Sequence, residues 1–126
     1  MSTLKLDTIA SRDGTESTDV TNVINGSAKA WVNFNGTGTV AIRKSFNVSS
    51  ITDNGTGDYT ITFTNAMPDV NYSVVAQSTA TGKGYIINFP KNASSGNITT
   101  TSVVGLTADF NGNSSDNAYV FVAIHR

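Results

Sequence analysis

The chain has 126 residues, a formal net charge of −1 and no cysteine, so it fits a single domain and excludes disulfides and thiolate metal sites. Val, Ile and Thr together number 39, against three Leu and one Glu, and this scarcity of helix formers predicts an all-β fold. The eight Lys and Arg are scattered and no apolar stretch approaches ~20 residues, which argues against nucleic-acid binding and membrane insertion.

Residues 1–27 have a pattern different from the rest. Leu4 and Leu6 alternate with charged residues and predict a short strand ending near Ile9. A polar, turn-rich spacer at 11–19 and a small apolar patch at 20–24 follow. These residues form either a flexible leader with one edge strand or an extended N-terminal arm that docks on another chain. We favour the arm, with Leu4, Leu6 and Ile9 as its anchors, because a flexible leader would not need an alternating apolar start.

Regular alternation begins at Ala28. Ala28, Ala30, Val32 and Phe34 share one predicted face, and the Asn-Gly that follows predicts a hairpin turn. The return strand is predicted from Val40 to about Val48, with Val40, Ile42, Phe46 and Val48 in phase. Lys44 interrupts this phase, which indicates an exposed strand end or a β-bulge.

Trp31 lies on the opposite face of the same predicted strand, among polar neighbours. It is either partly buried over a sheet face or an aromatic residue that contacts a subunit or a glycan.

The segment from Asp53 to Asp58, DNGTGD, could be mistaken for a calcium loop. The third and fifth positions are Gly55 and Gly57, which offer no side-chain oxygen, so we predict a tight hairpin turn instead. Tyr59, Ile61 and Phe63 then alternate with threonines as a half-buried strand.

Three further strands are predicted at 71–78, 85–89 and 98–104. The inward residues of the first are Tyr72, Val74 and Ala76. The strand at 98–104 is expected to bend at Gly105 and to continue through Leu106, Ala108 and Phe110.

The closing strand, 118–124, is apolar on both faces. Antiparallel strands usually face water on one side, so the second apolar face, with Tyr119, Phe121 and Ala123, is a predicted subunit interface. Seven to nine short strands predict an antiparallel β-sandwich over 28–126, preceded by the arm at 1–27.

No enzyme is predicted. The only histidine, His125, is penultimate in the chain, and one histidine without cysteine cannot form an ordinary zinc site. A carboxylate pair would suit glycoside hydrolysis, but most aspartates stand in turns, where a turn role explains them. We therefore expect no catalytic residue, metal or cofactor.

Two stretches resemble structural proteins of tailed bacteriophages, especially phages of marine bacteria and cyanobacteria. MSTLKLDTIASRDGTE is similar to the N-terminal leader of their virion appendage proteins. INGSAKAWVNFNGTGTVAIRKSFNVSSITDNGTGDYTITFTNAMPDVNYSV resembles a module of phage tail fibres and related proteins. The shared residues are Trp31, Phe34, Gly57, Tyr59, Phe63, Met67, Pro68, Tyr72 and Val74.

The resemblance implies a β-sandwich that associates as a homotrimer, made in the host cytoplasm and carried on the tail or capsid exterior of the virion. The arm would bind other virion proteins, and residues 77–117 would face outward. Without the long shaft of a full fibre, we expect a short tail fibre, knob or tail accessory protein. The alternatives are a capsid-decorating fibre protein and a carbohydrate-binding module that contacts host surface polysaccharide through Trp31 or Tyr85.

Overall fold

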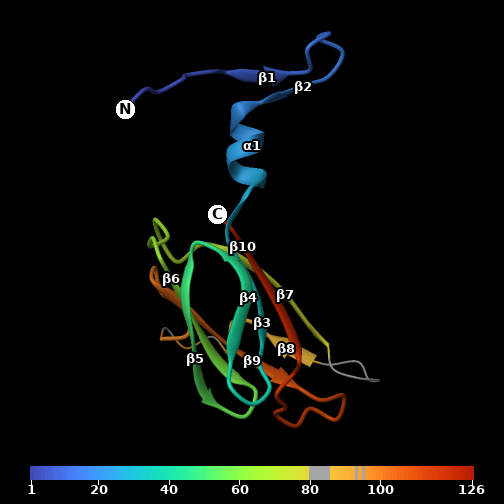
Figure 1. The fold of residues 1–126 in the computed structure, drawn as a ribbon. Helices are drawn as coiled ribbons and strands as arrows, with labels where there is room; N and C mark the ends of the chain where they lie inside the picture. Colours follow the sequence, from blue (N-terminus) through green and yellow to red (C-terminus); the bar gives the residue numbers. More distant parts are fainter. Residues whose placement is uncertain (80–85, 93, 95) are drawn as a thin grey trace.

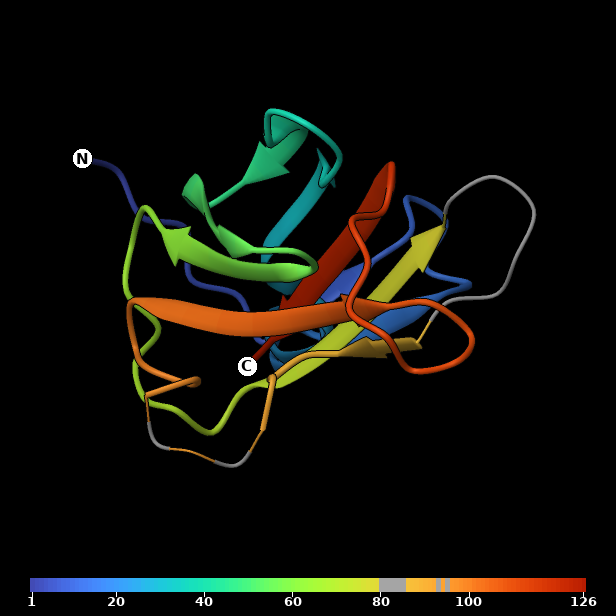
Figure 2. The same ribbon diagram turned by 90° about the horizontal axis from the view of Figure 1, so that it is seen from below.

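The computed structural model describes residues 1–79, 86–92, 94 and 96–126. Two four-stranded antiparallel sheets pack on each other (Figures 1 and 2), as predicted for a sandwich. The first sheet has the order β4-β3-β10-β7 and the second β5-β6-β9-β8. The first sheet contains β3 (Ala28–Asn35), β4 (Ala41–Phe46), β7 (Ser73–Thr79) and β10 (Tyr119–His125). The second contains β5 (Val48–Gly55), β6 (Asp58–Phe63), β8 (Ile86–Asn88) and β9 (Ser102–Ala108).

The core lies between the sheets and is formed by the predicted inward faces. Alternation on β3 buries Ala30, Val32 and Phe34, and alternation on β6 buries its aromatic and aliphatic positions in the same way. The rings of Phe34 and Tyr59 meet edge to face across the sheets with centroids 5.1 Å apart. The other buried core residues are Val48, Ile61, Phe63, Met67, Tyr72, Val103, Val120, Val122 and Ile124.

The predicted single strand from Val40 to Val48 is two strands, and the chain passes from the first sheet to the second between them. Asn47 makes this passage with a φ of 53°, in the left-handed region that asparagine tolerates. Its side-chain amide donates to the Lys29 and Asn65 carbonyl oxygens, and its Oδ1 accepts the Asn65 backbone N–H at 2.7 Å. Sequence alternation contains no signal for such a local kink.

β4 is an edge strand, and the inward residues predicted for the single strand at 40–48 are mostly outside the core. Ile42 and Phe46 are exposed, Val40 packs against the core and Val48 alone is buried. The β3–β4 register shifts opposite Asn33, so the predicted bulge is present. The bulge and the sheet change together break the expected phase.

The turn between β5 and β6 is the hairpin turn predicted for DNGTGD. Asp53 Oδ1 accepts the Gly55 backbone N–H at 2.9 Å, and Gly55 and Gly57 both have positive φ. A Cβ on Gly57 would stand 2.3 Å from the Thr107 carbonyl oxygen, so this turn packs closely against β9.

The strand predicted at 98–104 begins later than expected. β9 starts at Ser102, while Ile98 only forms an isolated bridge with Val103. The strand does run on through Gly105 as predicted, but it ends at Ala108 and leaves Phe110 exposed. At Gly105 the Phe89 ring occupies the space that a side chain would need, 2.2 Å from an added Cβ.

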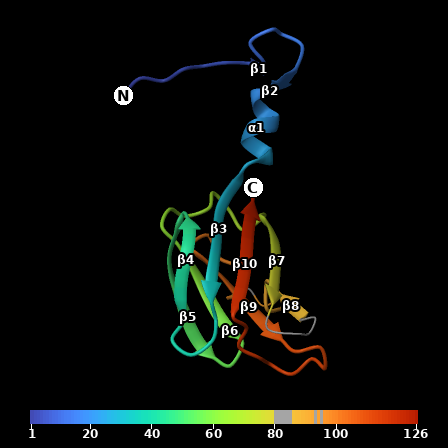
Figure 3. The ribbon, with the colours of Figure 1, turned by 45° about the vertical axis from the view of Figure 1, so that its right-hand side comes forward.

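Residues 1–27 lie outside both sheets. β1 (Thr8–Ala10) and β2 (Ser17–Asp19) form a two-stranded hairpin, and α1 (Val20–Gly26) leads from it into β3. The hairpin and α1 extend beyond the end of the sandwich where β10 ends (Figures 1 and 3). We expected one short strand followed by a polar spacer. The spacer instead forms the loop and the second strand of the hairpin, and in the loop Asp13 Oδ1 accepts hydrogen bonds from Ser11 and Thr15.

Within the part of the chain that the structure describes, no helix has the length and apolar character to cross a membrane.

Candidate functional site

The outward face of the first sheet carries an unusual set of side chains. The register places Phe46, Trp31, Ala123 and Val75 in one row across β4, β3, β10 and β7. Side chains of neighbouring strands in such a row lie close enough to contact one another. The row is therefore an apolar band across the full width of the sheet.

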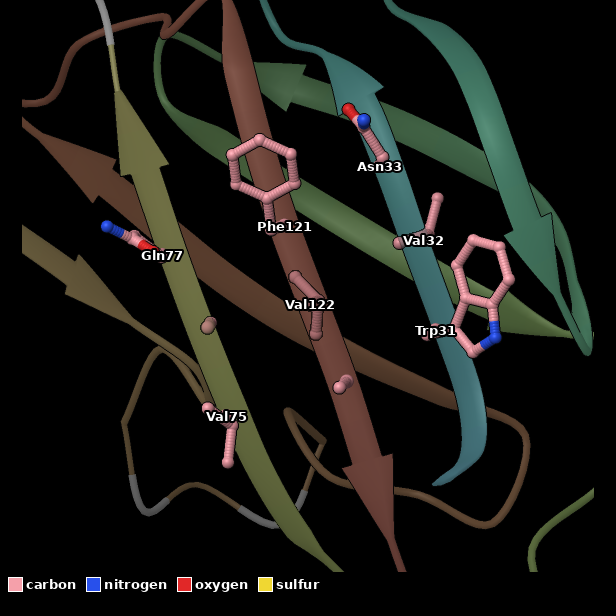
Figure 4. Close-up of a pocket in the computed structure, with 9 residues that line it drawn as sticks. Trp31, Val32, Asn33, Val75, Gln77, Phe121 and Val122 are labelled. Carbon is pink, nitrogen blue, oxygen red and sulfur yellow. The ribbon is translucent and has the colours of Figure 1, made fainter. Parts of the chain in front are cut away.

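The next row along the same face combines one ring with polar groups. Phe121 on β10 lies between Asn33 of β3 and Gln77 of β7 in the register, and Lys44 on β4 is opposite Asn33. Figure 4 shows the Phe121 ring on its central strand, with the two amide side chains on the strands at either side. Tyr119 lies two residues before Phe121 in β10 and on the same face.

We call Trp31, Phe46, Val75, Tyr119, Phe121 and Ala123 the apolar sheet face. The exposed fractions of its five large side chains run from 37 % at Trp31 to 64 % at Val75. Between β3, β10 and β7 the face forms a shallow groove of about 400 Å³ (Figure 4). The outward face of an antiparallel sheet is normally polar, because it contacts water and not the core. These exposed apolar side chains therefore indicate an interaction surface.

Arg43, at the β4 bulge, organises one end of the apolar sheet face. Its guanidinium stands 4.2 Å from the centroid of the Tyr119 ring and donates to the Ala118 carbonyl oxygen at 2.6 Å. Tyr119 in turn stacks on Phe121, with centroids 6.2 Å apart. These contacts hold both rings in place before any partner binds, which lowers the entropy lost on association.

The structure brings together residues that the sequence analysis put in two separate sites. Trp31, a predicted glycan or subunit contact, is on the same face as the predicted interface residues Tyr119, Phe121 and Ala123. Tyr85, the other predicted glycan contact, lies outside the described residues. Val75 was missed, although the apolar pair at 74–75 put hydrophobic residues on both faces of its strand, a signal like that of β10.

The predicted docking residues of the arm are separate from this face. Leu4, Leu6 and Ile9 are all exposed, Leu4 most of all, and they precede or lie in β1 at the far side of α1. A loop beside them contains Asp13. Hydrogen bonds from Ser11 and Thr15 lower the pKa of the Asp13 carboxyl to about 2. The arm therefore has apolar side chains with no cover from the sandwich.

The opposite end of the sandwich contains a buried polar cluster. The Tyr59 hydroxyl lies 2.9 Å from both the Gly36 carbonyl oxygen and Asp116 Oδ1. Burial, reinforced by the Asp116 carboxylate, raises the pKa of Tyr59 well above its usual range. The hydrogen bonds of its hydroxyl join the β3–β4 turn to the loop before β10.

Two ion pairs join opposite charges in the part of the chain that the structure describes. Lys91 pairs with Asp58 at 2.5 Å, and Arg126 pairs with Asp69 at 2.5 Å. Among the described residues, no group of three or more His, Asp or Glu is placed to hold a metal ion.

Comparisons of the chain with protein-family models, with curated proteins and with solved structures found no significant match.

Proposed function

We propose that this chain is a non-enzymatic structural protein of a bacteriophage virion, a short tail fibre, knob or tail accessory protein. In this proposal the chain self-associates, as a homotrimer, through the apolar sheet face and attaches to other virion proteins through residues 1–27. The phage assignment rests on the resemblance of the leader and of the module that contains Trp31 and Tyr59. The observation that carries self-association is the apolar sheet face, which crosses all four strands of the first sheet.

The size of the apolar sheet face is consistent with one part of a larger contact. Aromatic side chains have roughly 150–250 Å² each, and the four rings of the face are 37 % to 54 % exposed. Together they present roughly 350 Å² of ring surface. A stable interface buries about 800 Å² on each partner. The rings are thus suited to be the anchors of a copy–copy contact and need further surface around them.

The arm supports a role in attachment. An isolated two-stranded hairpin is marginally stable in water, and β1–β2 leaves Ile9 and the preceding Leu4 and Leu6 uncovered. Docking on another virion protein would bury these side chains and stabilise the hairpin. Charged residues in the hairpin loop, among them Arg12 and Glu16, suit a heterologous partner with complementary charges.

Mass measurement in solution tests self-association directly. The wild-type chain is expected at three times its 13.2 kDa chain mass, and Phe121→Asp is expected to reduce it to the monomer. Thr52→Asp puts the same charge on an exposed position of the second sheet and serves as the matched control. A wild-type monomer at all accessible concentrations would contradict the proposal.

Deletion of residues 2–16 tests attachment separately. The truncated chain is expected to form an oligomer with the same number of copies as the wild type and to be absent from purified virions. Normal incorporation of the truncated chain would refute the role of the arm. A density map of the virion, searched for this sandwich, distinguishes a tail position from the capsid-decorating alternative.

A carbohydrate-binding module is the second candidate, and one feature of the groove favours it. Asn33 and Gln77 present amide groups on either side of the Phe121 ring, the combination of ring and amide that suits a sugar. Arg43 lies 3.4 Å from Asn33 Oδ1, which leaves that amide oxygen partly engaged. Binding on a glycan array that disappears in Trp31→Ala would support this reading; the same binding in the variant would reject Trp31 as a contact.

A further inference from the structure

The helix α1 has an apolar side that its own chain does not cover. Val20, Val23 and Ile24 stand at i, i+3 and i+4 and therefore on one side of the helix. Val23 is 40 % and Ile24 55 % exposed, and no residue of α1 is buried. Figures 1 and 3 show α1 between the hairpin and the sandwich, with no other element alongside it.

A helix this short does not stand alone in water. Isolated helices below about 12–15 residues are marginal, and most helical stability in proteins comes from packing. α1 has seven residues, and Asp19 at its N-terminus makes no capping hydrogen bond with its side chain. The bonds at its other end run from Ser27 to the Val23 carbonyl oxygen and from Lys29 to the Ile24 carbonyl oxygen. Packing against another molecule would supply the missing stabilisation.

The charge distribution indicates that this other molecule is a second copy. Residues 20–28 contain no charged side chain, whereas the adjoining hairpin carries Arg12, Asp13, Glu16 and Asp19. When identical helices pack in parallel around a rotation axis, each residue lies near its own counterpart, so a charge would face a like charge. An uncharged helix avoids this repulsion.

The position of α1 gives the second copy a continuous contact. α1 leads through Ser27 into β3, where Trp31 begins the apolar sheet face and pairs with Ala123 of β10. The ring surface of the face alone, roughly 350 Å², falls short of the ~800 Å² per partner that a stable interface needs. Because α1 directly precedes β3, a helix–helix contact there would add area next to the apolar sheet face.

We propose that α1 is a self-association helix, which packs against α1 of neighbouring copies through Val20, Val23 and Ile24. The helices and the apolar sheet faces then form one copy–copy interface. This inference rests on the self-association in the proposed function. It adds that the symmetry axis of the oligomer runs alongside α1.

Two neighbouring residues provide a matched pair of full-length variants. Ile24→Asp places a charge in the proposed helix contact, and Asn25→Asp places it on the other side of α1. Sedimentation equilibrium is expected to give a dissociation constant at least about tenfold higher for Ile24→Asp, a change of 1.4 kcal/mol. Asn25→Asp is expected to stay within about twofold of the wild type.

Single cysteines supply a second readout that does not depend on weakening the helix. Because the chain has no cysteine of its own, any disulfide in Ile24→Cys joins two copies. A disulfide requires Cα atoms about 4.4–6.8 Å apart, so Ile24→Cys is expected to form covalent dimers under mild oxidation. Asn22→Cys, on the other side of α1, is expected to remain largely uncrosslinked.

The outcomes separate the two proposals. A wild-type chain that stays monomeric overturns self-association and this inference with it. A wild-type oligomer whose dissociation constant is the same in Ile24→Asp, and in which both cysteines crosslink equally or neither does, overturns the role of α1 alone.

Discussion

The two sheets share a core but differ on their outward faces. On the second sheet the outward positions of β5 and β6 include Ser50, Thr52, Thr60 and Thr62, and the outward Val104 and Leu106 of β9 are half-buried. On the first sheet the corresponding positions are the apolar sheet face. Antiparallel sheets normally present one polar face to water. The second sheet follows this rule, so the departure on the first indicates a partner rather than a property of the fold.

The largest expected effect separates the inner face of the first sheet from its outer face. Phe34→Ala removes a fully buried ring and is expected to lower the free energy of unfolding by about 3–5 kcal/mol. Phe46→Ala, on the outward face of the same sheet, is expected to cost less than about 1 kcal/mol in the monomer. Urea denaturation of both variants measures the difference. Equal losses would mean that Phe46 is part of the core after all.

The second prediction makes the first sheet resemble the second. The double variant Trp31→Thr, Phe121→Thr replaces two aromatic anchors by the residue type that covers β6. Because interface anchors commonly contribute about 2 kcal/mol each, the dissociation constant of the oligomer is expected to rise at least about 100-fold. Analytical ultracentrifugation measures it. Thr60→Val on the second sheet is the control, and a similar rise there would remove the distinction between the two faces.

The third prediction compares a turn of each sheet. Gly57, in the β5–β6 turn, has a φ of 70° and backbone of β9 against its Cβ position, whereas Gly38, before β4, has a φ of 62° and open space around it. Both alanine variants adopt an unfavourable φ. Gly57→Ala is expected to cost roughly 2–3 kcal/mol and Gly38→Ala about 1 kcal/mol. Equal melting temperatures of the two variants in thermal denaturation would contradict this prediction.

The smallest effect concerns the ion pair at one end of the first sheet. The Arg126 side chain, which follows β10, holds the pKa of Asp69 at about 2 instead of the usual 3.8. Because this pKa is lowered in the folded state, the contribution of the pair to stability is present above pH ~4 and is lost as the pH falls through about 2. In Arg126→Ala, carbon-13 NMR titration is expected to show the pKa of Asp69 rising from about 2 towards 3.8, with the Asn71 backbone N–H still holding it partly down. An unchanged titration would show that the Asn71 backbone N–H alone holds the pKa down.

Much of the fold and part of the candidate site could be predicted from the sequence. The alternation at 28–34 and 59–63 identifies two core strands, because successive side chains of a strand point to opposite faces. The doubly apolar closing strand already indicates that Tyr119, Phe121 and Ala123 need a cover. The helix α1 could not be predicted, since three apolar residues over five positions are too short a pattern to distinguish from a loop.

The residue pattern therefore specifies the fold class and indicates that one apolar face needs a cover. Which residues share that face depends on how the strands pair in the folded chain. Phe46 leaves the expected core position because the bulge at Arg43 shifts the phase of β4 by one residue, and Trp31 joins Ala123 because β3 pairs with β10. Alternation is a local property of one strand, whereas the composition of a sheet face depends on which distant strands pair and in which register. The apolar sheet face is assembled by those pairings.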